Sequence, residues 1–522
     1  MPLKYATGPV SYLYDDVEKK NGSIKREKVK QVLWGDWINV TGPETDGWVN
    51  VTYGKKPFFM KEDELQDERV LEIIFLDIGQ GDACILTEPG AHQPPRVIVV
   101  DAGIAGNTNG FLNWRFRDFD NAGQLHAALI THPDQDHYRG FLPIFRNKKL
   151  AIERVYHNGL VERTGDDLLG PLEDGYLTDV IADNDALEAL MANPANRGRK
   201  NYPKLMKTAI DNDKIGPIMA LTTAHGTVEH GKTYMPGFAP ADPGPLEIEV
   251  LGPVVERDAA GNPRMRAFGN TPSSGSKNDG KTKNGHSILL RLSFNGFRVL
   301  FGGDLNTSSE TFLMQWYGGA PAVSAPLDAS DEEIAAIADP DVIARAKERF
   351  DVDLMKCCHH GSSDVTEEFL TASAASAYVI SSGDEEGHVH PRPDLLGLLG
   401  KTGDGHRPLL LSTELLRSTR ERESDDLRKK IDAVNIEIAD ENRKGDDADK
   451  DALKDLQRKR RSLLNDALRR NVGVYGAINL RTDGETAVLA FRKEKASAKN
   501  RWFYYELHRD PSGAFFPELK GH

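Results

Sequence analysis

Cysteine is scarce in this sequence, and long apolar segments are absent from it. Three cysteines occur among 522 residues, and no pair of them has the Cys-x-x-Cys spacing of a zinc motif. So low a number excludes a disulfide scaffold and is typical of proteins from a reducing compartment. No segment approaches the roughly 20 apolar residues of a membrane-spanning helix, and the first residues lack the apolar core of a secretion signal. We therefore expect a cytoplasmic protein that does not insert into a membrane.

Positive charge is also in deficit. Lysine and arginine number 66 against 80 aspartates and glutamates, which gives a net charge of −14. A protein that coats nucleic acid without sequence preference depends on lysine and arginine to displace counterions, so this balance argues against that class. It leaves room for an enzyme with a local basic channel on an acidic body. The chain is long enough for two or three domains.

Residues 1–66 contain short apolar runs separated by turn residues, which predicts a small all-β domain. Trp48, Val51 and Tyr53 belong to one such run, which ends at Gly54. This stretch resembles the end of a bacterial SH3-like barrel. The resemblance implies a domain that binds a peptide or protein partner. The alternative is a barrel that only packs on the rest of the chain.

A different pattern begins at residue 67. Apolar segments at 71–76, 96–100 and 127–131 predict strands, and each is followed by aspartate or histidine. Strands that end at such residues place polar side chains at one rim of a sheet, where catalytic loops are commonly carried. Residues 67–414 are therefore predicted to form the core of an α/β domain. Within it, the glycine-rich and polar segment 269–285 predicts a loop.

Residues 415–470 have a helical pattern instead. Apolar residues recur there at helical spacing on both sides of a charged break at Gly445. The pattern predicts an antiparallel helical hairpin, inserted before the strands of residues 471–522 that complete the core. Three roles are open for this hairpin. It could pair with a second copy of the chain as a dimerisation arm, fold back as a lid, or simply pack helix on helix.

The strongest chemical signal is the segment Thr131-His132-Pro133-Asp134-Gln135-Asp136-His137. Four side chains that can bind metal lie within six residues, directly after an apolar strand. Imidazole and carboxylate together suit zinc, manganese or iron. A tight turn after a strand can direct such side chains inward from alternate positions, so we expect a metal site here.

Further candidate ligands follow other predicted strands. Asp304 comes after an apolar strand and two glycines, where the backbone can approach a ligand closely. One carboxylate shared by two metals would hold them ~3.5–4 Å apart. His359 and His360 follow the next strand, and His390 follows a later one. Single histidines in such places are more often structural than ligands, and their value comes from recurring in order after strands.

Together with Asp77-Ile78-Gly79-Gln80-Gly81-Asp82 and Asp101-Ala102-Gly103, these segments resemble the ordered motifs of the metallo-β-lactamase superfamily. More narrowly, they resemble the soluble hydrolase domain of ComEC-type DNA-uptake proteins. The resemblance covers residues 70–400 and the strands after the hairpin, but not the membrane channel of the ComEC proteins. It implies an αββα sandwich with the metals at one edge of the two sheets.

The resemblance also implies roles for individual residues. The metal ligands for one or two divalent ions would be His132, Asp134, Asp136, His137, Asp304 and His390, with Asp304 as the bridge. The catalytic residues that move protons would be Asp136, His359 and His360. The residues that brace the ligands from outside would be Asp77, Asp82 and Asp101.

Two features depart from the common pattern of the superfamily. Asp134 stands where many relatives have histidine, which makes the site richer in oxygen and favours manganese over zinc. The further histidine that many members supply between the cluster and the bridging aspartate lies in no recognisable motif here. The remaining candidates for it are His157, His225, His230 and His286. One metal could therefore be weakly held.

The resemblance implies hydrolysis of phosphodiesters, most specifically in DNA, by a water molecule that a metal ion activates. The candidates for phosphate contacts are Arg139, Lys277, Lys281 and Lys283. The alternative is that the three lysines only keep a loop solvated. Two other functions stay open. One is hydrolysis of a cyclic nucleotide, a phospholipid or an amide, and the other is a binding or scaffold protein without catalysis.

Overall fold

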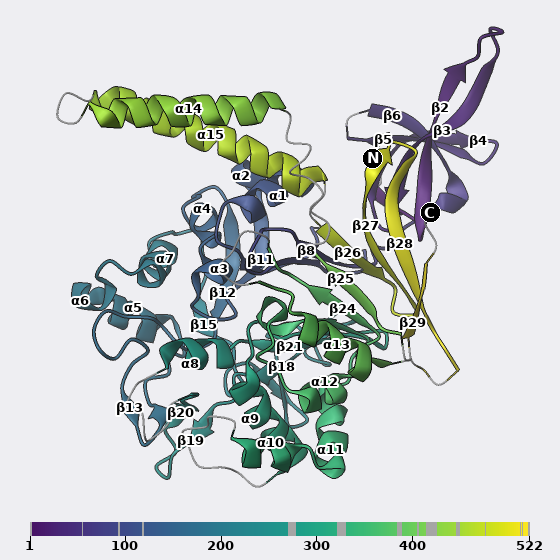
Figure 1. Cartoon of the computed structure of the whole chain (residues 1–522). Coiled ribbons are helices and arrows are strands. Elements are labelled where there is room, and N and C mark those ends of the chain that lie inside the picture. The colour runs from purple at the N-terminus through teal and green to yellow at the C-terminus, as the bar shows by residue number, and fades with distance from the viewer. Residues whose placement is uncertain are drawn as a thin grey trace.

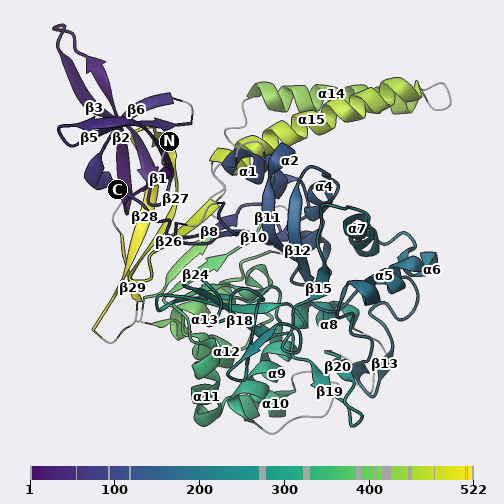
Figure 2. The same ribbon diagram turned by 180° about the vertical axis from the view of Figure 1, so that it is seen from behind.

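Figure 1 shows the computed structural model of the whole chain. It describes residues 3–519 except 55, 92–93, 117–118, 270–277, 321–329, 384–388, 405–406, 414–424, 445–448, 475–476, 512 and 514. The described part contains a small N-terminal sheet, two large central sheets flanked by helices, and a pair of long projecting helices (Figures 1 and 2). The mixed α/β class predicted from the sequence is confirmed at this level. No helix in the described part is both long and apolar enough to cross a membrane.

The larger central sheet has ten strands in the order β15-β12-β11-β10-β9-β8-β26-β27-β28-β29. Their bounds are β8 (Leu71–Leu76), β9 (Ala83–Thr87), β10 (Val97–Ala102), β11 (Gln124–Leu129), β12 (Ala151–His157), β15 (Ile218–Ala220), β26 (Ala477–Thr482), β27 (Thr486–Ser497), β28 (Asn500–Arg509) and β29 (Phe515–Leu519). β26 pairs antiparallel with β8, so the C-terminal strands extend a sheet that the first half of the chain begins.

The second central sheet has eight strands in the order β16-β17-β18-β21-β22-β23-β24-β25. Their bounds are β16 (Thr227–Glu229), β17 (Lys232–Tyr234), β18 (Leu246–Gly252), β21 (Leu289–Phe294), β22 (Phe297–Phe301), β23 (Leu354–Lys356), β24 (Ala377–Ile380) and β25 (Leu409–Ser412). The last four strands are parallel. A separate small sheet consists of β13 (Leu172–Glu173), β14 (Tyr176–Leu177), β20 (Pro263–Arg266) and β19 (Glu256–Arg257).

The two central sheets stack face to face around the main apolar core. Phe75 of β8 and Phe301 of β22 stack across the interface, with 5.9 Å between their ring centroids. Within β8, Ile73 and Phe75 face the other sheet, whereas Ile74 and Leu76 face helices, so every residue of the strand is buried. A strand that is covered on both faces is mostly apolar, and the one charged residue of this segment, Glu72, is buried and paired with Arg115 and Arg481.

Helices cover the outer face of each central sheet and complete four layers in the order helix, sheet, sheet, helix. Beside the ten-stranded sheet lie α1 (Asn107–Arg115), α2 (Phe119–Ala122), α4 (Phe141–Phe145), α5 (Asn184–Ala192) and α7 (Asn201–Ile210), with α6 (Pro194–Arg197) between the last two. Beside the eight-stranded sheet lie α9 (Thr307–Gly318), α10 (Asp331–Ile337), α11 (Pro340–Phe350), α12 (Glu367–Ser373) and α13 (Pro393–Thr402).

The N-terminal sheet has the strand order β3-β2-β6-β5-β4-β1-β7. Its strands are β1 (Leu3–Ala6), β2 (Val10–Glu18), β3 (Ile24–Leu33), β4 (Trp37–Thr45), β5 (Trp48–Tyr53), β6 (Lys56–Lys61) and β7 (Leu65–Gln66). The short 3-10 turn η1 (Glu62–Glu64) connects β6 to β7. Leu13, Val32, Val51 and Met60 belong to its own small core. This core is separate from the core between the central sheets.

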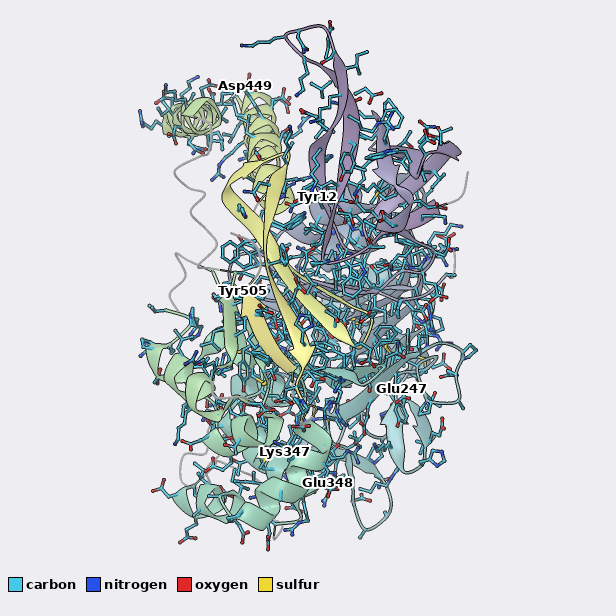
Figure 3. All side chains as sticks on the ribbon, turned by 90° about the vertical axis from the view of Figure 1, so that its right-hand side faces the viewer. Tyr12, Glu247, Lys347, Glu348, Asp449 and Tyr505 are labelled. Atoms are coloured by element: carbon cyan, nitrogen blue, oxygen red, sulfur yellow. The ribbon has the colours of Figure 1, made fainter. Side chains whose placement is uncertain are left out.

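The N-terminal sheet is anchored on the C-terminal strands. The side-chain oxygen of Gln31 accepts hydrogen bonds from the backbone N–H groups of Arg501 (2.7 Å) and Trp502 (3.1 Å). Figure 3 views this side of the molecule and labels Tyr12 on β2 and Tyr505 on β28. The small domain thus packs on the large one, and its binding to a peptide partner stays a prediction.

The helical pair consists of α14 (Asp425–Arg443) and α15 (Lys450–Val474) and projects away from the sheets (Figures 1 and 2). It connects β25 of one central sheet to β26 of the other. α15 also contacts α1, which ties the pair to the core. The opposite end, near Asp449, is exposed (Figure 3). Pairing with a second copy through these helices stays a prediction.

Candidate metal centre

The ends of several strands bring the candidate ligands together at one rim of the two central sheets. β11 leads to His132, and the one-turn helix α3 (Gln135–Tyr138) that follows carries Asp136 and His137. β22 leads to Asp304, and β23 leads to the turn η2 (Cys358–Gly361), which carries His360. The parallel pairing of β10 with β11 and of β22 with β23 makes these loops leave the same side of their sheets.

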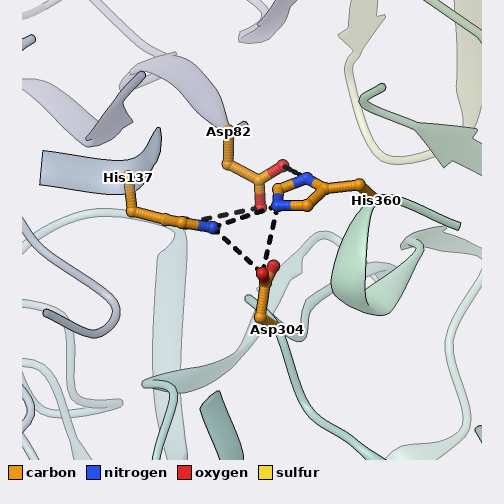
Figure 4. Close-up of side chains that lie close together, drawn as sticks. All are labelled: Asp82, His137, Asp304 and His360. Atoms are coloured by element: carbon orange, nitrogen blue, oxygen red, sulfur yellow. Dashed lines mark hydrogen bonds and ion pairs between the residues drawn. The ribbon is translucent and has the colours of Figure 1, made fainter. Parts of the chain in front are cut away.

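Three ligand atoms form the centre of the site (Figure 4). Nε2 of His137 lies 3.2 Å from Nε2 of His360 and 3.2 Å from Oδ2 of Asp304. Nε2 of His360 lies 3.0 Å from the same oxygen. Ligand atoms that share one ion at about 2.0–2.2 Å stand roughly 3.0–3.5 Å apart. The three residues therefore have the spacing that a single divalent ion requires.

The other ring nitrogen of each histidine is held by an oxygen acceptor. Nδ1 of His137 lies 2.8 Å from Oδ2 of Asp101. Nδ1 of His360 lies 3.1 Å from the backbone oxygen of Ser381, with Oδ1 of Asp82 next to it at 3.3 Å. An oxygen acceptor on Nδ1 keeps the proton on that nitrogen and leaves the lone pair of Nε2 for a metal. Asp101 is itself fixed by the backbone N–H (2.8 Å) and the hydroxyl (2.7 Å) of Thr131.

Asp82 lies next to the centre and is paired with a buried cation. Ligand atoms of Asp82, His137, Asp304 and His360 all lie within 4.8 Å of one another. The ammonium of Lys356 pairs with Oδ2 of Asp82 and donates to the backbone oxygen of Gly303 (3.2 Å). Asp82 also lies 3.3 Å from Nδ1 of His360 and 4.0 Å from Nδ1 of His137. Its predicted position behind the ligands stays a prediction, and Lys356 had no part in the sequence-based prediction.

Asp136 approaches the centre from the solvent side. Its Oδ2 lies 3.4 Å from Nε2 of His360, and its side chain keeps 26% of its surface exposed. Burial works against its charge, yet the hydrogen bond from His360 and the nearby charge of His137 hold the pKa of Asp136 well below its usual range. The carboxylate is therefore ionised at neutral pH and is able to bind a cation or accept a proton.

The centre is electrostatically prepared for positive charge. Burial opposes protonation of the histidines, but the Asp304 carboxylate raises the pKa of both His137 and His360 well above the ordinary value. Burial likewise opposes ionisation of Asp304, and the two histidines hold its pKa well below the usual range. A divalent ion would take the place of these protons, because a bound imidazole must be neutral.

His132 and Asp134 form a second, looser set around the same bridging carboxylate. Nε2 of His132 lies 3.8 Å from Oδ2 of Asp134 and 3.9 Å from Oδ2 of Asp304. Nδ1 of His132 is held by the hydroxyls of Thr131 (3.1 Å) and Ser287 (3.2 Å). Its Nε2, like Oδ1 of Asp304, is buried and has no hydrogen-bond partner among the described residues.

His359 and His390 lie outside the central group of ligand atoms. His359 precedes His360 in η2, and both have left-handed backbone conformations, with φ of 47° and 54°. The ring centroid of His359 lies 6.1 Å from that of His390 and 6.3 Å from that of His360. Asp77 is buried at the end of β8, where its Oδ1 accepts from the backbone N–H of Gly79 (3.4 Å). The predicted roles of His359, His390 and Asp77 stay predictions.

The four other histidines considered as ligands have neighbours elsewhere. Nε2 of His286 lies 2.7 Å from the backbone oxygen of Arg266, and Nδ1 of His157 accepts from the N–H of Gly159 (3.1 Å). Nδ1 of His225 lies 2.8 Å from the hydroxyl of Thr222, and His230 is exposed beside Glu229. Accordingly, none of the four belongs to the group of converging ligand atoms in the described part of the chain.

The basic residues predicted to contact phosphate differ in their burial and in their contacts. Residues 279–285 form the helix α8 (Asp279–Gly285), so the predicted loop is wrong for this part; the side chain of Asn278 caps the helix by accepting from Lys281 N–H (3.1 Å). Lys283 points from this helix to Asp134. Arg139 is exposed, and Lys277 lies outside the described residues.

A cavity of about 370 Å³ opens beside the centre. Its lining combines acidic and basic side chains: Asp134, Asp136, Glu162, Arg199, Lys200 and Lys283, together with Pro133, Gln135, Tyr138 and Asn201. Asn201 donates to the side-chain oxygen of Gln135 (3.3 Å), which ties the start of α7 to the metal-binding loop. Arg199 and Lys200 were not expected from the sequence, because they lie more than 60 residues from the nearest motif in an unremarkable polar segment.

No protein-family model matches this chain, and a search of curated proteins finds no match. Among solved structures, it is similar to a metal-dependent hydrolase of Parabacteroides distasonis, with 11% identity over 77% of this chain and 98% of that one and a TM-score of 0.23. It is also similar to the subclass B3 metallo-β-lactamase MEM-A1 from a soil metagenome, with 12% identity over 56% of this chain and 80% of that one and a TM-score of 0.23. A third similar structure is the Rm3 metallo-β-lactamase, with 14% identity over 56% of this chain and 78% of that one and a TM-score of 0.22. TM-scores of this size do not establish a common fold, so function is derived below from the residues of this chain.

Proposed function

We propose that this protein is a metal-dependent hydrolase of phosphodiesters, with DNA as the first substrate to test. The observation that carries the proposal is the convergence of His137, His360 and Asp304 at 3.0 to 3.2 Å, with the far nitrogen of each histidine held by an oxygen acceptor. A structural site needs no acidic residue open to solvent, whereas Asp136 stands between this centre and a cavity.

A divalent ion in this centre would supply Lewis acidity, which makes a water molecule easier to deprotonate and neutralises negative charge on the substrate. His137, His360 and Asp304 would hold the ion. Asp101 and the backbone oxygen of Ser381 would keep the two imidazoles in the required tautomer. These two acceptors fix the orientation of the rings before any substrate arrives, which limits reorganisation during the reaction.

Asp136 is placed to act as the general base. Its carboxylate is ionised, partly exposed and 3.4 Å from the His360 nitrogen that faces the centre. A proton released by the attacking water would therefore have an acceptor that also faces the cavity. Lys283, Arg199 and Lys200 line the same cavity and would bind the anionic oxygens of a phosphodiester.

A second candidate is hydrolysis of a small molecule such as a cyclic nucleotide. The size of the cavity favours it, because about 370 Å³ lies within the roughly 300–1,000 Å³ of small-molecule sites. The net charge of −14 also favours a substrate smaller than a DNA duplex.

The test is hydrolysis by the metal-loaded protein of single-stranded DNA, double-stranded DNA, a cyclic nucleotide and bis(p-nitrophenyl) phosphate. The matched control is Asp304→Asn, which keeps the shape of the side chain and removes the charge that faces both histidines. Cleavage of DNA that is lost in the control supports the first proposal. Cleavage of the cyclic nucleotide alone supports the second. A metal-loaded protein that cleaves none of them contradicts a phosphodiesterase.

A further inference from the structure

Lys283 occupies an unusual position for a lysine, because it is held inside the acidic part of the site. Its ammonium pairs with Oδ1 of Asp134 and lies 3.2 Å from Oε1 of Glu162. Only 12% of its side chain is exposed. Two carboxylates on one buried ammonium favour its charged form.

The helix that carries Lys283 is fixed on both sides. The backbone oxygen of Lys281 accepts from Nδ2 of Asn306 (2.9 Å), and the hydroxyl of Thr282 donates to the backbone oxygen of Phe268 (3.2 Å). These contacts hold α8 against the start of α9 and against the segment before residue 270. The helix that carries Lys283 is therefore fixed in place, and no movement of α8 is needed to bring the ammonium of Lys283 to Asp134.

Both oxygens of Asp134 are taken by protein donors. Lys283 pairs with Oδ1, and the side-chain amide of Asn284, in the orientation that satisfies its neighbours, donates to Oδ2 (2.9 Å). A carboxylate oxygen already bound to an ammonium is a weaker metal ligand, because its charge is largely neutralised.

The second set of ligands is thereby reduced to two atoms. Nε2 of His132 and the bridging carboxylate of Asp304 remain, at 3.9 Å from each other. Neither His157 nor His286 belongs to the group of converging ligand atoms among the described residues. Two protein ligands are fewer than the three or four that divalent ions usually find in tightly bound protein sites. By contrast, the neighbouring set offers His137, His360 and Asp304 at 3.0 to 3.2 Å.

We propose that the centre binds one divalent ion, and that the ammonium of Lys283 provides the positive charge where a second ion would otherwise lie. The inference rests on the metal centre of the proposed function and goes beyond it in assigning the second position to a residue of the chain. The fixed ammonium lines the cavity beside Asp136 and faces the space that an anionic substrate would enter. The positive charge of this ammonium is therefore present at the cavity whether or not a metal ion is bound.

The test is the number of metal ions bound per chain, measured by native mass spectrometry and elemental analysis after manganese loading and dialysis. The expected value for the parent protein is one. Its manganese should give the paramagnetic resonance signal of an isolated ion, whereas two ions bridged by Asp304 would give an exchange-coupled signal. Two tightly bound ions in the parent protein would overturn the inference directly, whatever any variant does.

The variant Lys283→Met removes the ammonium and leaves the carboxylates of Asp134 and Glu162 without their cation. A second manganese ion should then bind, raising the number per chain from one to two. Lys283→Arg keeps the charge and should stay at one. A Met variant that remains folded, as judged by circular dichroism, and still binds one ion overturns the role given to Lys283. A parent protein that binds no divalent ion at all contradicts the metal centre itself, and with it the proposed function.

Discussion

Nε2 of His137 lies 3.2 Å from Nε2 of His360, although the two residues are 223 positions apart in the chain. Two ring nitrogens at this distance share a hydrogen bond when one of them carries a proton, and a metal ion bound by both would take the place of that proton. His360→Asn should therefore lower the affinity for manganese or zinc by more than the roughly 10–100-fold that loss of an outer partner costs. Asparagine is suitable because it tolerates the left-handed backbone at this position. Isothermal titration with either metal measures the effect.

The matched control is His359→Asn, one residue earlier and also in the left-handed region. The ring of His359 lies 6.3 Å from that of His360 and does not belong to the group of converging ligand atoms, so this variant should keep its metal affinity within about twofold. A protein that loses metal with His359→Asn and keeps it with His360→Asn would show that the other histidine of the pair is the ligand.

Metal binding should depend on pH through the two central histidines. Asp304 raises the pKa of His137 and His360 well above the ordinary value, so a metal must displace protons at neutral pH. Each ion bound should release at least one proton, and affinity should fall as the pH is lowered from 8 to 6, because protons then compete more strongly. Titration in buffers with different heats of ionisation counts the protons. An affinity that stays constant over this range is incompatible with the raised pKa values.

Most residues of this site could be predicted from the sequence, because they lie at the ends of apolar segments. The run 71–76 is apolar except for Glu72 because β8 is covered on both faces, and the cluster from His132 to His137 follows a largely buried strand. Local pattern does not reveal which of these side chains converge. His360 reaches the centre because β23 pairs with β22, a relationship between segments that are separated by α9 to α11.

The contribution of Lys283 was also hidden from local pattern. The segment 269–285 is rich in glycine and polar residues, which predicts a loop. Its last part is helical because Asn278 caps it, and because α8 packs on α9. Glu162 and Asp134, the partners of Lys283, are more than 100 residues away in the sequence, as their hydrogen bonds record separations of 121 and 149. Long-range charge pairing of this kind leaves no periodic signal.

Buried Glu310 should make the stability of the protein depend on pH. Burial in α9 raises the pKa of Glu310 from 4.5 to about 8, although Thr366 donates to it through its backbone N–H and its hydroxyl. Between these two pH values the unfolded chain loses the proton and the folded chain keeps it. Its contribution to stability is therefore complete below pH 4.5 and decreases as the pH rises to 8, by up to about 1.4 kcal/mol per pH unit.

Glu310→Gln removes this titration and keeps an oxygen that accepts from Thr366. The variant should gain stability relative to the parent protein between pH 5 and pH 8, as measured by urea unfolding at several pH values. Other groups titrate in both proteins and cancel in the comparison. A difference in unfolding free energy that is the same at pH 5 and pH 8 would show that Glu310 has an ordinary pKa in the folded protein.

Gln31 should be important for holding the N-terminal sheet on the C-terminal strands. Its side-chain oxygen is the acceptor for two backbone N–H groups, those of Arg501 and Trp502. Gln31→Ala leaves both donors without this acceptor, at a cost of about 1–3 kcal/mol for each donor that stays buried. Limited proteolysis should then release the N-terminal domain sooner. Gln31→Glu keeps an acceptor oxygen and is the control, and equal cleavage rates for the two variants would contradict this role.

Arg199 and Lys200 should determine how strongly an anionic substrate binds. Both line the cavity beside Asp136 and are exposed, so each contact with a phosphate oxygen contributes up to about 1 kcal/mol. Arg199→Gln and Lys200→Gln should each raise KM by up to about fivefold, and leave kcat nearly unchanged, because such contacts bind substrate and transition state alike. Added salt should reduce the difference from the parent protein.

Arg197→Gln is the control for this pair, since Arg197 lies two residues earlier and donates to the backbone oxygen of Met191 (2.9 Å), outside the lining of the cavity. It should leave KM unchanged. If Arg199→Gln and Lys200→Gln also leave KM unchanged while the protein hydrolyses a phosphodiester, the substrate enters the centre from another side. If instead kcat falls and KM stays constant, these cations act on the transition state, and their charge reaches the reacting phosphate itself.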